Sequence, residues 1–292
     1  MSSGGATFTP RIYPRPTPLS SKDVLASAII SNIRVPFLCA ALTKAVEPAY
    51  FAIAKAWLAN GWSERWFFII GLMLVHLTLY VGMNGFFLYC DVNGVLEKYK
   101  LRRTPAMGPS WDLIYDTWKQ AFIGQFIIGP PTGYFIYDAF KYFGMPAMDA
   151  PLPSFFYLMA FYSAAHIANG HLFYWSHRLV HSKMLYKFIH KQHHMYKGTI
   201  GFSAEYANPI EQIVSNQGPT VIGCLLAGSH VCVFLLWIAT RLEQTYEGHS
   251  GYCFYGTFLH KLGLTNAEGA AFHDFHHTGN RYVHCIFLLG FS

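Results

Sequence analysis

The chain has 292 residues, of which 53% are hydrophobic and only 12% charged, with a formal net charge of +6. An average soluble protein has roughly 25% charged residues, so this composition excludes both an ordinary water-soluble globule and an intrinsically disordered chain. Six scattered cysteines without a C-x-x-C pair argue against a disulfide scaffold, and the absence of a dense basic run argues against nucleic acid as a partner.

The first two predicted segments lie before any uncharged stretch. Residues 1–22 are rich in Pro, Ser, Thr and Gly and have no apolar core, which predicts a disordered N-terminal arm. Residues 35–58 are apolar but interrupted by Lys44, Glu47 and Lys55, which predicts a helix lying in the membrane interface.

Four later windows contain no Asp, Glu, Lys or Arg, and about 20 apolar residues suffice to span a bilayer core. These windows are residues 66–90, 120–137, 150–177 and 212–240. The second is short and contains Gly129-Pro130-Pro131, so we expect a kinked span over 120–143. The first and third predict spans over 66–90 and 152–175, so the chain divides into an N-terminal part, 23–150, and a C-terminal domain, 151–292.

Histidines dominate the C-terminal domain. They fall into three clusters, H-x-x-x-H, H-x-x-H-H and H-x-x-H-H, with one more histidine between the second and the third. On a helix, residues three and four apart share a face, so each cluster can direct two or three imidazoles toward one point. Neutral imidazole binds iron, zinc and copper, and nine donors fit two metal ions better than one tetrahedral zinc. The predicted metal ligands are His177, His181, His190, His193, His194, His249, His273, His276 and His277.

The residues beside these histidines argue against hydrolysis. A metalloprotease helix carries Glu after its first histidine, whereas Arg178 and Lys191 occupy the corresponding positions here. An all-nitrogen dimetal site beside apolar spans suits oxygen activation on a lipid. A metal transporter is a competing function class, but transporters place ligands near the membrane midplane rather than at span ends.

The membrane topology must bring all clusters to one side. The basic loop 91–119 is predicted to be cytosolic by the positive-inside rule. Two crossings later, His177 emerges on the same side. A single crossing over 212–240 would separate His249 from His193, so we expect a re-entrant helical hairpin broken near Gly228-Ser229. The predicted fold is an all-α integral membrane protein with about three full spans plus this hairpin, capped by a cytosolic histidine-rich helical domain that houses a dimetal site.

Four further residues are candidates for contacts just outside the ligands. His171 is an ionisable group inside an uncharged window, where such groups are costly and often functional. Glu205 and Asp274 could accept a proton from a ligand imidazole and so fix its tautomer. Asn208 precedes a proline, is expected to start the re-entrant element and could reach the site. We expect no catalytic residue beyond the metal ligands and no organic cofactor site.

The histidine series, together with several short sequence motifs, resembles the membrane fatty acid hydroxylase and sterol desaturase superfamily, and within it the 4-methylsterol monooxygenases. The motifs are Tyr186-Lys187-Phe188-Ile189-His190-Lys191, Glu205-Tyr206-Ala207-Asn208-Pro209-Ile210-Glu211, Arg241-Leu242-Glu243-Gln244-Thr245, His249-Ser250-Gly251-Tyr252 and His273-Asp274-Phe275-His276-His277. The resemblance covers residues 170–280 well, and residues 1–150 only in hydropathy.

The resemblance implies two iron ions, which zinc could replace, molecular oxygen, and electrons from NAD(P)H through cytochrome b5 and its reductase. It also implies a multi-pass protein of the endoplasmic reticulum membrane whose metal site faces the cytosol. The implied reaction is oxidation of the 4-methyl group of a sterol intermediate in sterol biosynthesis.

Other functions remain open at this stage. A fatty acid or sphingolipid hydroxylase, a sterol 5-desaturase and an aldehyde decarbonylase of the same superfamily share the metal chemistry. The segment Val283–Ser292 departs from the family pattern and reads as a truncated end, so an inactive truncated scaffold is the alternative from a different class.

Overall fold

The computed structural model describes residues 21–101, 110–262 and 264–279, so nearly all of the predicted N-terminal arm and the segment Val283–Ser292 lie outside the described residues. Within them, the only β-pairing is a single bridge between Lys100 and Tyr252. The α-helices are α1 (Ser21–Ala59), α2 (Glu64–Asn93), α3 (Trp111–Ile123), α4 (Gly129–Tyr142), α5 (Phe155–Val180), α6 (Pro209–Glu211), α7 (Gly218–Leu226), α8 (Val231–His249), α9 (Phe258–Leu262) and α10 (Ala267–Gly279).

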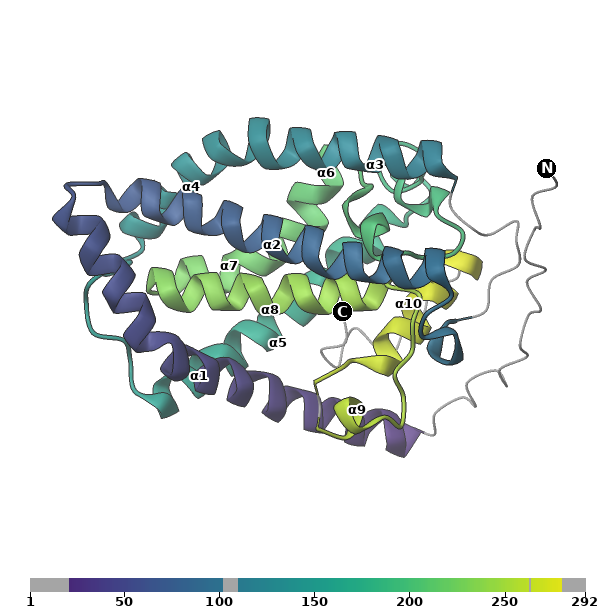
Figure 1. The fold of residues 1–292 in the computed structure, drawn as a ribbon, viewed down its shortest axis with the longest axis horizontal. Helices are drawn as coiled ribbons and strands as arrows, with labels where there is room; N and C mark the ends of the chain where they lie inside the picture. The colour runs from purple at the N-terminus through teal and green to yellow at the C-terminus, as the bar shows by residue number, and fades with distance from the viewer. Residues whose placement is uncertain (1–20, 102–109, 263, 280–292) are drawn as a thin grey trace.

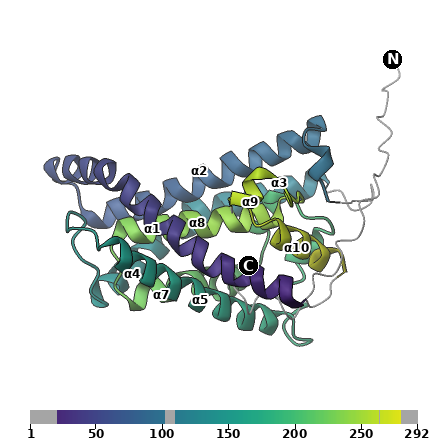
Figure 2. The same cartoon turned by 90° about the horizontal axis from the view of Figure 1, so that it is seen from below.

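The long helices run roughly along one axis of an elongated bundle (Figure 1). Helix α8 occupies the centre, with α2 packed along it and α4 beyond α2. Helix α1 crosses the opposite side of the bundle and packs on α5, as the view from below shows (Figure 2). The short helices α9 and α10 gather at one end, which α5 and α8 reach with their C-terminal turns.

A continuous apolar core fixes α5 against α8. Trp237 and Phe234 of α8 are fully buried, and Phe234 stacks on Phe68 of α2 with ring centroids 5.6 Å apart. The Tyr162 hydroxyl of α5 donates to the Val233 carbonyl of α8 at 3.1 Å. Because these contacts fix two helices that end at the histidine clusters, they set the positions of the clusters.

The kink predicted at Gly129-Pro130-Pro131 takes the form of a π-helical turn over Gly124–Ile128, between α3 and α4. Proline has no amide proton, so Pro130 cannot bond the carbonyl four residues earlier and the helix widens before it. A second π-helical turn, Gln212–Gln217, precedes Gly218-Pro219 at the start of α7 for the same reason.

Two of the described helical segments, Asn32–Ala59 within α1 and Glu64–Asn93, are long and apolar enough to cross a membrane by length and composition alone. The second contains the predicted span 66–90. The first contains 35–58, for which we expected an interfacial helix, and Pro36 and Pro48 are accommodated inside it. The predicted spans 120–143 and 152–175 are helical over residues 120–142 and 155–175, and their crossing of the bilayer stays a prediction.

The predicted break in 212–240 is present. Helix α7 ends at Leu226 and α8 begins at Val231, with Gly228 between them at a φ of +54°. A Cβ atom at Gly228 would lie 2.2 Å from the Phe143 carbonyl oxygen, so glycine is required here both by conformation and by space. The re-entrant course of this pair through the membrane stays a prediction.

Candidate metal centre

The nine predicted ligands lie together at one end of the bundle. Helix α5 and its C-cap provide His177 and His181, and the last residue of α8 is His249. Helix α10 provides the third cluster. The second cluster does not lie on a regular helix as the spacing suggested: residues 182–192 form successive turns, and a short 3-10 helix, His193–Met195, follows.

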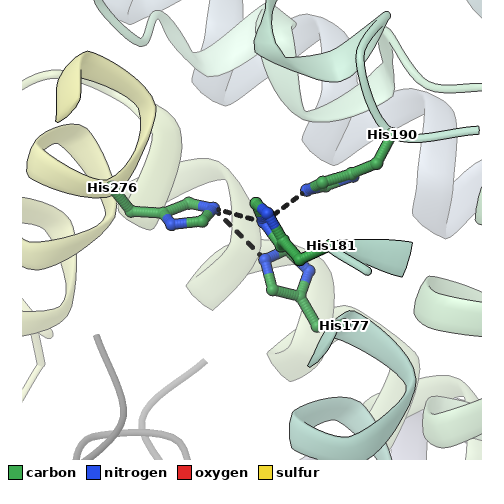
Figure 3. Close-up of side chains that lie close together, drawn as sticks. All are labelled: His177, His181, His190 and His276. Carbon is green, nitrogen blue, oxygen red and sulfur yellow. Dashed lines mark hydrogen bonds between the residues drawn. The ribbon is translucent and has the colours of Figure 1, made fainter. Parts of the chain in front are cut away.

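Four of these imidazoles converge in a group that we name the first quartet, made of His177, His181, His190 and His276 (Figure 3). Their Nε2 atoms face one another. His181 Nε2 lies 2.8 Å from His190 Nε2 and 3.1 Å from His276 Nε2, and His177 Nε2 lies 3.3 Å from His276 Nε2. Three of the four side chains are buried.

A second quartet lies next to the first and consists of His193, His249, His273 and His277, all of them buried. Its Nε2 atoms again face one another. His249 Nε2 lies 2.8 Å from His273 Nε2 and 3.4 Å from His193 Nε2, and His273 Nε2 lies 3.1 Å from His277 Nε2.

The ninth histidine, His194, lies between the quartets. Its Nε2 is 3.0 Å from His190 Nε2 of the first quartet. Its ring lies 4.6 Å from the ring of His277, in the second quartet, centroid to centroid. The nine histidines therefore form one continuous group with two points of convergence.

The distances between nitrogens test whether each quartet fits a metal ion. Two imidazole nitrogens bound at about 2.1 Å to one ion are about 3.0 Å apart at a right angle and about 3.4 Å apart at a tetrahedral angle. The contacts above span 2.8 to 3.4 Å, so both quartets already have the spacing of ligands that share an ion. One proton per imidazole cannot satisfy several Nε2 atoms that face one another, whereas a central cation satisfies all of them.

Burial also keeps these histidines in the form that binds metal. It lowers the pKa of His181 to about 3 and that of His249 to about 4, aided in both by the nearby His276. Burial likewise lowers the pKa of His193, His273 and His277 well below the ordinary value. Only the neutral ring has a free lone pair at Nε2, so the site is ready to ligate at neutral pH.

The outer ring nitrogens of three ligands have partners of two kinds. His249 Nδ1 lies 2.7 Å from the Thr245 carbonyl oxygen, and His277 Nδ1 lies 3.2 Å from the Tyr196 carbonyl oxygen. His190 Nδ1 instead lies 2.7 Å from a carboxylate oxygen, Glu211 Oε1. The sequence analysis did not predict this contact, although Glu211 is the last residue of one of the motifs given above.

Two of the four residues expected just outside the ligands lie apart from the quartets. His171 is exposed, and its Nδ1 bonds the Ile167 carbonyl of its own helix at 3.0 Å. Asn208 caps α6, its side-chain oxygen accepting from the Ile210 amide at 2.9 Å, which agrees with the predicted helix start.

The two expected carboxylates have partners of their own. Glu205 Oε1 lies 2.9 Å from His76 Nε2 and accepts from the Tyr246 hydroxyl at 2.8 Å, so it joins α2 to α8. Asp274 Oδ1 accepts from the amide and the hydroxyl of Thr199 at 3.1 and 2.8 Å. It thereby holds the loop after the second cluster against α10.

Comparisons with known proteins agree with this site. A sequence model described as fatty acid hydroxylase matches residues 162–291, the part that carries every clustered histidine. A Dictyostelium discoideum protein provisionally named a methylsterol monooxygenase is 34% identical, over 80% of this chain and 84% of its own. Methylsterol monooxygenase 2-2 of Arabidopsis thaliana is 32% identical, over 76% and 80%. Methylsterol monooxygenase 1 of Gallus gallus is 32% identical, over 71% and 68%.

No solved structure gives a significant match to this chain. The family match and the extent of the relatives settle the assignment without one. The chain belongs to the fatty acid hydroxylase family and shares most of its length with that family's methylsterol monooxygenases.

Proposed function

We propose that this protein is a membrane-bound di-iron monooxygenase that oxidises the 4-methyl group of a sterol intermediate, with the nine clustered histidines as the metal ligands. The observation that carries the proposal is the pair of adjacent buried quartets in a chain related over most of its length to methylsterol monooxygenases. The first quartet would hold one ion and the second quartet the other, with His194 between them.

The donor set supports iron and oxygen chemistry. Imidazole suits iron, zinc and copper, and the quartets contain no thiolate or carboxylate ligand. Iron bound here would supply the redox chemistry that activates molecular oxygen. Each round then consumes one oxygen molecule, two electrons and two protons, converts one C–H bond to C–OH and releases one water. Three rounds take a methyl group through the alcohol and aldehyde to the carboxylate.

The protein's own residues hold the site and keep water from it. The Phe173 ring stacks on His177 with centroids 5.3 Å apart and an interplanar angle of 16°. This contact fixes the ring of a first-quartet ligand and covers it with apolar surface. Because eight of the nine histidine side chains are buried, the bonds to their outer nitrogens, rather than solvent, decide how the rings are oriented.

The charges around the second cluster support an acidic protein as the electron donor. We propose that this donor is cytochrome b5, supplied by its reductase and NAD(P)H. Residues 150–204 contain no acidic residue. Exposed cations in this region are Arg178, Lys183, Lys187, Lys191 and Lys197. A uniformly basic face accelerates association with an acidic partner by electrostatic steering. The same bias supports our proposal that this face lies in the cytosol, and the proposed location is the endoplasmic reticulum membrane.

The test is complementation of a eukaryotic strain that lacks 4-methylsterol oxidation, followed by sterol profiling. The proposal predicts that the wild-type chain clears the accumulated 4-methylsterols and that His181→Ala does not. The matched control is His171→Ala, on the same helix but exposed, which should clear them. If the wild-type chain is expressed and binds iron but leaves 4-methylsterols in place, the sterol assignment is wrong. Lipid profiling of the same cells would then show which C–H bond is oxidised.

A further inference from the structure

One buried acidic side chain contacts the metal centre without belonging to either quartet. Glu211 is 2% exposed, and its Oε1 lies 2.7 Å from Nδ1 of His190, which is fully buried. The opposite nitrogen of that ring, His190 Nε2, faces His181 Nε2 at 2.8 Å and His194 Nε2 at 3.0 Å. The carboxylate therefore touches the outer edge of a ring whose inner edge lies at the point of convergence.

The local sequence explains how Glu211 arrives there. Asn208 caps α6, Pro209 occupies its first turn, and the π-helical turn that follows packs against α5, which carries His177. Glu211 is the last residue of α6, is buried and directly precedes this π-helical turn.

Burying a carboxylate with a single hydrogen-bond partner costs free energy, because the group loses its hydration. Glu211 Oε2 has no hydrogen-bond partner among the described residues. An ionised carboxyl group at this position needs a nearby positive charge to offset its desolvation. The point of convergence of the first quartet is where a bound cation would provide that charge, one imidazole away.

The two quartets differ in this respect. His249 and His277 of the second quartet bond backbone carbonyl oxygens through Nδ1, and those groups are neutral. A hydrogen bond to an ionised group is roughly twice as strong as one between neutral groups. A ring backed by a carboxylate is fixed in the Nδ1–H tautomer and is a stronger donor at Nε2.

We infer that Glu211 is a positioning residue for the metal centre: it holds His190 with Nδ1 protonated and Nε2 toward the first quartet, and so makes the two metal sites unequal in affinity and in ligand field. The inference rests on the proposed function, because it assumes that the quartets bind metal. Glu211 acts through His190 and touches no substrate.

The experiment titrates cobalt(II) into the full-length, metal-free protein in detergent or nanodiscs and follows the cobalt d–d absorption and affinity of each equivalent. The variant is Glu211→Gln, which keeps the shape and an accepting oxygen but removes the charge. Loss of an outer partner of a ligand typically costs about 10- to 100-fold in metal affinity. We expect that loss for one equivalent, with a changed d–d spectrum, and no change for the other.

Single-ligand variants identify the affected equivalent. His181→Ala removes a first-quartet ligand and His249→Ala a second-quartet ligand. The equivalent weakened by Glu211→Gln should be the one that is lost in His181→Ala. Glu211→Asp, with the charge restored on a shorter side chain, should recover part of the affinity.

The matched control is Glu64→Gln, a partly buried glutamate whose carboxylate accepts from Lys141 Nζ at 2.9 Å and whose residue belongs to neither quartet. It should leave both cobalt affinities unchanged. Equal weakening of both equivalents by both glutamine variants would overturn the inference and show a general loss of stability. Unchanged binding in Glu211→Gln would also overturn it and leave the dimetal proposal standing. A wild-type protein that binds no cobalt would overturn the dimetal proposal itself.

Discussion

Acidification should open the metal-free site, because the folded protein holds its clustered histidines neutral. An exposed histidine titrates near 6.5, whereas burial lowers the pKa of His181 to about 3 and that of His249 to about 4. Below pH 6.5 the unfolded state therefore binds more protons than the folded state. The free energy of unfolding is therefore highest above pH 6.5. It decreases as the pH falls from there toward the pKa values that these histidines have in the folded state.

The size of the effect follows from linkage. Between pH 7 and pH 5, each histidine that stays neutral in the fold and protonates when unfolded costs about 2 kcal/mol. Eight clustered histidines outside the predicted spans have a lowered pKa, namely His177, His181, His190, His193, His194, His249, His273 and His277. Together they exceed about 10 kcal/mol, which is comparable with the whole stability of a typical domain.

Hydrogen–deuterium exchange of the metal-free protein at pH 7.5, 6.0 and 5.0, corrected for the chemical exchange rate, measures this opening. Segments 190–205 and 267–279 should lose protection between pH 6.5 and 5, while 231–237 in the apolar core keeps it. Bound metal competes with protons for the same nitrogens, so it should move the opening to lower pH. Equal protection of the histidine segments at pH 7.5 and 5.0 would refute the reasoning.

Three further changes test other parts of the account. His193→Ala should remove one of two metals and abolish oxidation while leaving membrane insertion intact, as checked by metal analysis. The control is His171→Ala, because His171 is exposed and bonds the Ile167 carbonyl of its own helix. Two metals retained in His193→Ala would contradict the second quartet. Cysteines introduced at the exposed Ile210 and Tyr255, which lie before α7 and after α8, should both react with an impermeant thiol reagent applied from the cytosol. If one of them reacts only after the membrane is permeabilised, the segment crosses the membrane once and the hairpin is wrong. Glu205→Gln should lower the free energy of unfolding by about 1–3 kcal/mol, measured by thermal melting, because its partners are left without a charged acceptor; an unchanged melting temperature would mean that the contact does not stabilise the fold.

The sequence predicted which histidines gather but not how they divide. The i, i+4 pair His177 and His181 falls in one quartet, as helical geometry requires. In the third cluster, by contrast, the i, i+4 pair His273 and His277 shares the second quartet, while His276 belongs to the first. The H-x-x-H-H motif on α10 therefore contributes to both quartets instead of directing its three rings to one point.

The outer contacts were harder to predict because they depend on packing between distant segments. Glu205 and Glu211 lie six residues apart in one motif, and this spacing alone does not predict which of them contacts a ligand histidine. Glu205 lies in the 3-10 helix Gly201–Glu205 and bonds to α2 and α8, whereas Glu211 follows the turn at Asn208 and reaches His190. The helix break near Gly228 was predictable, because it followed from the need to bring His249 beside His193.

The central claim is that the nine histidines form two adjacent metal sites with nitrogen ligands. Iron analysis combined with X-ray absorption spectroscopy at the iron edge of the purified, membrane-reconstituted chain tests it most directly. The account predicts two irons per chain, each with a first shell dominated by imidazole nitrogen, and one iron in His181→Ala. One or no iron in the wild-type chain, or a first shell of sulfur, would contradict it.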